Sequence, residues 1–167
     1  MTEDAGGTGG TLAAQVISML RAAGRTVAAA ESLTGGLVVA ALTSVPGASV
    51  AVRGGVVSYA TDLKASLLGV PQAMLDKHGA VYPGVASAMA NGVRQRLGAT
   101  FGVATTGVAG PDPADGQPVG TVHIAVSAQD DTVVRTLALD GDRDRIRRLT
   151  VERSLALLLG RLREDIR

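Results

Sequence analysis

The stretch VAAAESLTGG, residues 27–36, decides how this sequence folds and where its chemistry is expected. Residues 26–30 are a short apolar run, typical of a strand that is covered on both faces of a sheet. Three polar residues come at its end or directly after it: Glu31, Ser32 and Thr34. Open α/β sheets keep their ligand sites at the carboxyl ends of the strands. We therefore expect these side chains to lie at a functional site.

Apolar spacing predicts that helices and strands alternate along the rest of the chain. Helices are expected at 11–23, 34–43, 62–68, 72–77, 83–97 and 142–163, and strands at 26–30, 50–59, 101–105, 121–128 and 132–139. The last two strands flank Gln129-Asp130-Asp131 and should form a hairpin. The pattern predicts a three-layer α/β/α fold on a mixed β-sheet, as one domain over residues 11–167. Residues 1–10 are expected to be a flexible Gly-rich tail.

Composition narrows the classes of function. The chain has 167 residues, a net charge of +1, 46% hydrophobic residues and no cysteine. A charge this close to neutral offers no broad basic field for nucleic acid, and aromatic side chains for base stacking are scarce. Without cysteine there is neither a disulfide nor a thiolate ligand for zinc. The apolar runs are too short to span a membrane and residues 1–10 lack a signal-peptide pattern, so we expect a cytoplasmic protein.

Polar side chains gather where the predicted strands end. They form four sets: Glu31, Ser32 and Thr34; Ser58 and Tyr59 with Lys64; Thr105, Thr106 and Gly107; and Arg143 and Arg145. Each set alone has an ordinary explanation, since hydroxyls before a helix are usually N-caps and a lysine on a short helix is usually solvated. Converging strand ends would instead make one pocket. The two histidines have no partners at metal-ligand spacing, so we expect no metal site.

A serine in this pocket needs a base, and the sequence offers a lysine for that role. Neither His78 nor His123 is placed to activate a hydroxyl, whereas Lys64 follows the end of a predicted strand. A lysine held neutral by burial can replace histidine as the base for a serine nucleophile. Tyr59 either relays the proton or packs. The glycine-rich loop 105–120 matches neither a P-loop nor GxGxxG, but its amides are suited to an oxyanion or a phosphate.

Five ordered motifs resemble a known family. They are AESLTGGLV at 30–38, PGAS with RGGVVSYATDLKASLLGV within 46–70, HGAV at 78–81, TGVAGP with PVGTV within 106–122, and GDRDRIR at 141–147. Together they resemble the C-terminal domain of the competence/damage-inducible protein CinA, whose stand-alone versions are nicotinamide-nucleotide amidases. The resemblance runs from about residue 12 to residue 162, nearly the whole chain.

The resemblance implies hydrolysis of the carboxamide of nicotinamide mononucleotide (NMN) to nicotinate mononucleotide and ammonia, in NAD salvage, without metal or cofactor. Its motif positions place catalysis on Ser32, Ser49, Tyr59 and Lys64. Lys64 is then the base, and either serine is the nucleophile. The expected substrate-binding residues are Glu31, Thr34, Gly35, Gly36, Thr106, Gly107 and Arg145, with Arg145 as the phosphate clamp. A homo-oligomer, a dimer or larger, is also implied.

The chain departs from the family pattern at two segments. Tyr82-Pro83-Gly84 stands where relatives carry a small polar residue and an acid, and the loop 111–118, PDPADGQP, lacks a glycine pair. Both segments are expected on the pocket rim and should bear on substrate preference. Two other functions stay open: a non-catalytic, regulatory nucleotide-binding module, in which Ser32 and Thr34 are only caps, and an amidase for a different carboxamide.

Overall fold

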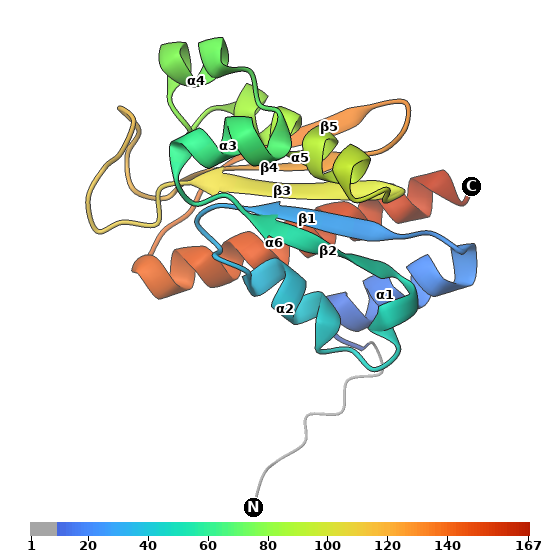
Figure 1. Ribbon diagram of the computed structural model, residues 1–167. Coiled ribbons are helices and arrows are strands. Elements are labelled where there is room, and N and C mark those ends of the chain that lie inside the picture. Colours follow the sequence, from blue (N-terminus) through green and yellow to red (C-terminus); the bar gives the residue numbers. More distant parts are fainter. Residues whose placement is uncertain (1–9) are drawn as a thin grey trace, which may run out of the picture.

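The computed structural model describes residues 10–167, so nearly all of the expected N-terminal tail lies outside the described residues. The chain builds a five-stranded sheet with helices on both faces (Figure 1). The strands are β1 (Val27–Glu31), β2 (Val52–Val57), β3 (Phe101–Gly107), β4 (Thr121–Ser127) and β5 (Thr132–Ala138). The helices are α1 (Leu12–Ala23), α2 (Leu37–Thr43), the short 3-10 helix η1 (Ala48–Val50), α3 (Thr61–Leu68), α4 (Gln72–His78), α5 (Pro83–Arg96) and α6 (Arg143–Asp165).

The sheet is mixed, with strand order β2-β1-β3-β4-β5. Strand β1 pairs in parallel with both β2 and β3, while β3–β4 and β4–β5 are antiparallel. In the parallel part, Glu31 pairs with Val57 on one side and with Thr105 on the other. The ends of β1, β2 and β3 therefore meet at one edge of the sheet, which is the arrangement expected for a ligand site.

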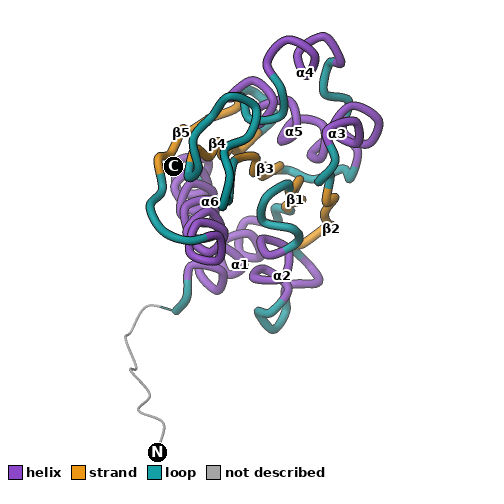
Figure 2. The backbone as a smooth tube through the Cα atoms, turned by 90° about the vertical axis from the view of Figure 1, so that its left-hand side faces the viewer, coloured by secondary structure: helices purple, strands orange, loops and turns teal. Residues whose placement is uncertain are grey.

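The two faces of the sheet carry separate hydrophobic cores. Helices α1, α2 and α6 cover one face, where Leu20, Val38 and Leu158 pack against the strands. Helix α5 covers the other face around Met89, α3 packs against α5 through Leu68, and α4 packs on α3 and α5. The view along the strands separates these two layers (Figure 2). The three-layer α/β/α fold on a mixed sheet, expected from the sequence, is confirmed.

Several element boundaries differ from those expected. Helix α2 begins at Leu37 and not at residue 34, because Gly35 and Gly36 take positive φ angles of 57° and 106° in a turn before it. Strand β2 begins at Val52, since η1 occupies residues 48–50. Strand β3 runs on to Gly107. Each shift lies next to a turn, where local propensity sets the boundary least firmly.

A close approach of two helices positions the segment that carries Lys64. A Cβ built on Gly92 of α5 would lie 1.9 Å from the carbonyl oxygen of Leu68, the last residue of α3. Only glycine lets α3 lie this close to α5. None of the helices within residues 10–167 is both long and apolar enough to span a bilayer.

Candidate active site

Ser32 and Lys64 meet at the edge of the sheet where β1 and β2 end. Lys64 Nζ lies 3.1 Å from Ser32 Oγ, and it donates to the carbonyl oxygens of Ser58 at 2.6 Å and of Tyr59 at 3.4 Å. Helix α3 starts at Thr61, three residues before Lys64 and four residues after the end of β2. The lysine side chain therefore folds back over the strand end and approaches the serine hydroxyl.

Burial changes the acid–base chemistry of Lys64. The side chain is fully buried, and it is among the largest of the fully buried side chains. Burial disfavours the charged ammonium and lowers the pKa of Lys64 from 10.5 to about 8, while the negative charge of Asp115 works in the opposite direction. A lysine with this pKa is partly neutral near neutral pH, which is the state that a general base requires.

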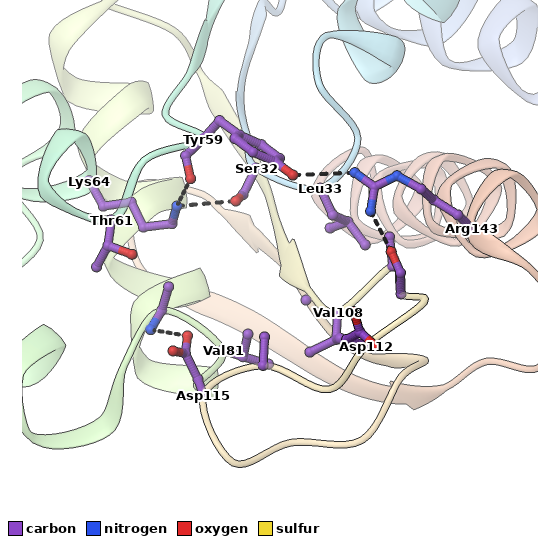
Figure 3. Close-up of a pocket in the computed structure, with 15 residues that line it drawn as sticks. Ser32, Leu33, Tyr59, Thr61, Lys64, Val81, Val108, Asp112, Asp115 and Arg143 are labelled. Carbon is purple, nitrogen blue, oxygen red and sulfur yellow. Dashed lines mark hydrogen bonds between the residues drawn. The ribbon is translucent and has the colours of Figure 1, made fainter.

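The serine and the lysine form part of the wall of a cavity of about 310 Å³ (Figure 3). The other walls come from Tyr59 and Thr61, from residues 80–81, from the loop that follows β3, and from Arg143. In Figure 3 the Ser32–Lys64 pair and Arg143 lie on different sides of this space. A ligand that reached both would extend across the cavity.

Arg143, at the start of α6, is the cationic side chain of the far wall. Its guanidinium donates to the Gly110 carbonyl oxygen at 2.5 Å and to the Tyr59 hydroxyl at 3.2 Å. Tyr59 is 62% exposed, and its ring points from the end of β2 toward α6 and away from Lys64. The Tyr59 hydroxyl thus holds Arg143 on the rim of the cavity. Among the hydrogen bonds of residues 10–167, none joins this hydroxyl to the Lys64 amine.

The loop after β3 is attached to the opposite wall through Asp115. Its Oδ2 accepts from the Ala80 amide at 2.9 Å, and the Ala80 carbonyl accepts from the Thr106 hydroxyl at 2.8 Å. Asp115 itself has a positive φ of 51°, a conformation that Asp tolerates better than most residues. The loop segment 111–118 therefore brings two carboxylates, Asp112 and Asp115, to the cavity.

Glu31 and Thr34 hold the strand end and helix α2 together behind the site. The buried Glu31 carboxylate accepts from the amides of Val38 and Val39 at 2.8 and 3.1 Å, and from the Thr34 hydroxyl at 2.6 Å. Thr34 also bonds Thr105 Oγ1 at 2.8 Å. The amides of Val38 and Val39 at the start of α2 are thus occupied by Glu31.

The residues expected at the site fall into three groups. Ser32, Tyr59, Lys64 and Gly107 line the cavity. The residues outside the cavity lining are Glu31, Thr34, Gly35, Gly36 and Thr106. Hydrogen bonds of Glu31, Thr34 and Thr106 link the elements that carry the cavity. Ser49 and Arg145 are not brought to it.

Ser49 and Arg145 are kept away for different reasons. Ser49 lies in η1, before β2, at the end of the sheet where Val27 pairs with Val52. Five strand residues separate that end from Ser32, roughly 15 Å, and Ser49 lines a different hollow. Arg145 is on the first turn of α6 but two residues beyond Arg143, so it projects from another side of the helix.

The sequence indicated some of the remaining site residues. Arg143 belongs to one of the four sets of polar residues at strand ends, but its position in the sequence did not show which of Arg143 and Arg145 faces the cavity. Asp112 and Asp115 were not singled out, although two acids in a Gly/Pro-rich loop after a buried strand were a usable signal. Tyr82 is stacked on His78 with ring centroids 3.8 Å apart and does not line the cavity.

The site fits acyl-transfer chemistry built from protein side chains. Within residues 10–167 no three His, Asp or Glu side chains gather as metal ligands. His123 is buried in β4, where its Nδ1 bonds Thr136 Oγ1 at 2.9 Å and burial lowers its pKa. A hydroxyl beside a lysine of lowered pKa, in a cavity that an arginine also lines, can attack the carbonyl carbon of a substrate.

Known protein sequences match this chain over most of its length. A model of the CinA C-terminal domain matches residues 10–162. A CinA-like protein of Frankia casuarinae is 54% identical over 153 residues, which are 92% of this chain and 35% of that protein. A CinA-like protein of Gloeobacter violaceus is 48% identical over 151 residues, 89% of this chain and 35% of the relative. The chain thus spans about a third of the length of these curated relatives.

Solved structures agree with the sequence matches. The competence/damage inducible protein CihA from Agrobacterium tumefaciens superposes with a TM-score of 0.86 at 39% identity, covering 89% of this chain and 92% of that one. A CinA superfamily protein from Klebsiella pneumoniae gives a TM-score of 0.89 at 30% identity, over 92% and 96% of the two chains. With the fold, the family model and these relatives in agreement, the chain belongs to the CinA C-terminal domain family.

Proposed function

We propose that this chain is an amidase that hydrolyses the carboxamide of NMN to nicotinate mononucleotide and ammonia. The observation that carries the proposal is the 3.1 Å contact between Lys64 Nζ and Ser32 Oγ, made by a buried lysine whose pKa is lowered to about 8. The choice of NMN rests on the resemblance to nicotinamide-nucleotide amidases, and the Arg143 guanidinium in the cavity wall supports a phosphorylated substrate.

As an ammonium, Lys64 donates to Ser58, Tyr59 and Ser32, and it can act as a base once it has lost one proton. An uncharged amine has two N–H donors and one lone pair. In that form the carbonyl oxygens of Ser58 and Tyr59 accept the two N–H groups, so the lone pair is left for the proton of the Ser32 hydroxyl. Lys64 is thereby oriented as a base toward Ser32.

The reaction then proceeds in two halves. Ser32 Oγ attacks the carboxamide carbon while Lys64 takes the hydroxyl proton, and the protonated Lys64 returns that proton to the nitrogen as the C–N bond breaks and ammonia leaves. In the second half, water attacks the ester on Ser32, again with Lys64 as base, and releases the nicotinate carboxylate and the serine hydroxyl. The N–H of Leu33, on the cavity wall, donates no hydrogen bond within residues 10–167 and is the proposed donor to the oxyanion.

The proposal takes Ser32 as the nucleophile, for reasons of distance. Ser32 contacts Lys64, whereas Ser49 lies at the other end of β2, outside the cavity. Arg143 takes the phosphate, because a guanidinium matches phosphate geometry and this one lines the cavity across from Ser32. The exposed Tyr59 ring holds Arg143 in place through its hydroxyl.

The test uses the two serines as a matched pair. We expect purified wild-type protein to release ammonia and nicotinate mononucleotide from NMN, Ser32→Ala to lose at least about 10³-fold in kcat, and Ser49→Ala to keep most of its activity. Thermal unfolding of both variants checks that the fold is intact. If Ser49→Ala were inactive and Ser32→Ala active, Ser49 and not Ser32 would be the nucleophile. Binding of NMN without ammonia release, at high enzyme concentration, would favour the regulatory module instead.

A further inference from the structure

The cavity carries negative charge that the proposed mechanism does not use. Asp112 and Asp115 line it together with Lys64 and Arg143. The ion pairs within residues 10–167 are Arg25–Asp165, Arg161–Asp131 and Arg161–Glu164, so neither cavity aspartate is neutralised by a salt bridge in the part of the chain that the structure describes. Charges that face a cavity without a partner are available to a ligand.

Asp115 is held in a fixed position although its loop is exposed. Its Oδ2 accepts from the Ala80 amide at 2.9 Å, and the Thr106 hydroxyl donates to the Ala80 carbonyl oxygen at 2.8 Å. Gly79 packs against the carboxylate so closely that a Cβ there would lie 2.8 Å from Asp115 Cγ. The segment 79–80 and the end of β3 therefore position the aspartate, and a positioned charge is more selective than a mobile one.

The second carboxylate oxygen of Asp115 is free. Among the hydrogen bonds of residues 10–167, Oδ2 accepts one and Oδ1 accepts none. The charge also acts on the reacting groups, since Asp115 raises the pKa of Lys64 against the larger effect of burial. In Figure 3 Lys64 and Asp115 both lie on the left of the cavity, above and below its open space, and Arg143 lies on the right. An anionic group thus faces the catalytic pair across this part of the cavity.

We infer that Asp115 is a specificity-determining residue that recognises a permanently cationic ring carrying the carboxamide. This inference rests on the proposed function. The carboxamide carbon has to reach Ser32 Oγ, which places the attached ring in the cavity beside Asp115. An N-glycosylated pyridine bears a positive charge on that ring and, in the nucleotide, a negative phosphate at the other end. The cavity has the complementary order of charges, with Asp115 facing Lys64 on one side and Arg143 on the other.

The substrate preference follows from this order of charges. A carboxamide on a neutral ring of the same shape gains nothing from Asp115, so the site should prefer cationic substrates. The attraction acts in a partly exposed cavity, where water screens it, and we expect about a tenfold effect on affinity and on kcat/KM. Asp112, on the same loop, is expected to contribute less, because no hydrogen bond within residues 10–167 fixes its carboxylate.

The test compares two ligands that differ in ring charge. NMN is the cationic probe, and benzamide riboside 5′-monophosphate, whose ring is neutral, is its isostere. The variant is Asp115→Asn, which keeps an acceptor for the Ala80 amide. Asp130→Asn, on the exposed turn between β4 and β5 at the far end of the sheet, is the control for net charge. Binding by calorimetry and hydrolysis are measured for each protein and ligand.

We expect Asp115→Asn to lose about tenfold on NMN and little on the neutral isostere, with Asp130→Asn unchanged on both. The acidic limb of the pH profile should also move to lower pH in Asp115→Asn, because the charge that raises the pKa of Lys64 is gone. Equal losses on both ligands would overturn the inference and leave the amidase standing. Wild-type binding that favours NMN without hydrolysis would remove the amidase and retain the inference, and no binding of either ligand would overturn both.

Discussion

Replacement of Lys64 tests the acid–base argument most directly, through stability as well as rate. Burial lowers the pKa of Lys64 from 10.5 to about 8. Between these two values the unfolded chain binds a proton that the native protein does not, so the free energy of unfolding rises with pH across this window. From pH 7 to pH 10 the gain for wild type amounts to about 2.5 kcal/mol, obtained from the two pKa values.

Lys64→Met removes this gain, because methionine does not titrate. Relative to the variant, wild type should become more stable by about 2.5 kcal/mol between pH 7 and pH 10, or about 5–10 °C in Tm for a chain of this size. Urea unfolding at both pH values measures the difference. Lys77→Met, an exposed site on α4, is the matched control and should show no such change relative to wild type.

The same lysine can be observed directly. The sequence contains two lysines, Lys64 and Lys77, so a protein labelled with ¹³C at lysine Cε gives two signals, which Lys77→Met assigns. The Lys64 signal should titrate near pH 8, and kcat/KM on NMN should fall about tenfold per pH unit below that value. A Lys64 signal that titrates above pH 10, together with a pH-independent stability difference, would refute the claim that burial prepares this lysine as a base.

Two further predictions concern residues that the fold separates or holds. Arg143→Gln should raise the KM for NMN about tenfold and change the KM for the phosphate-free riboside little. Arg145→Gln should leave the KM values for both substrates near those of wild type. Steady-state kinetics on the two substrates decides which arginine binds the phosphate. Glu31→Ala should destabilise the protein by about 2–3 kcal/mol, because the amides of Val38 and Val39 lose their buried acceptor. Urea denaturation measures that loss, and an unchanged midpoint would show that Glu31 does not hold α2.

The architecture could be predicted from the sequence because its signals are local. Apart from η1, apolar spacing marked the helices and strands within residues 10–167 to within a few residues, and the wholly apolar run before Glu31 indicated a strand covered on both faces. Short-range signals of this kind survive in the fold, since burying those apolar faces is what stabilises it. Parallel pairing of β1 with its neighbours then brings Ser32 close to the end of β2 and to Lys64.

By itself, the sequence therefore determined the three-layer fold, the edge of the sheet that carries the candidate site, and the presence there of Ser32 and Lys64. Only the tertiary structure decided which nearby groups face the cavity. Ser49 follows Ser32 closely in the family motifs but lies at the opposite end of β2, and Arg143 and Arg145 project about 200° apart around one helix. Asp115 reaches the site through a contact with Ala80, 35 residues away in sequence. Local periodicity specifies elements, whereas side-chain direction and long-range contacts depend on how those elements pack.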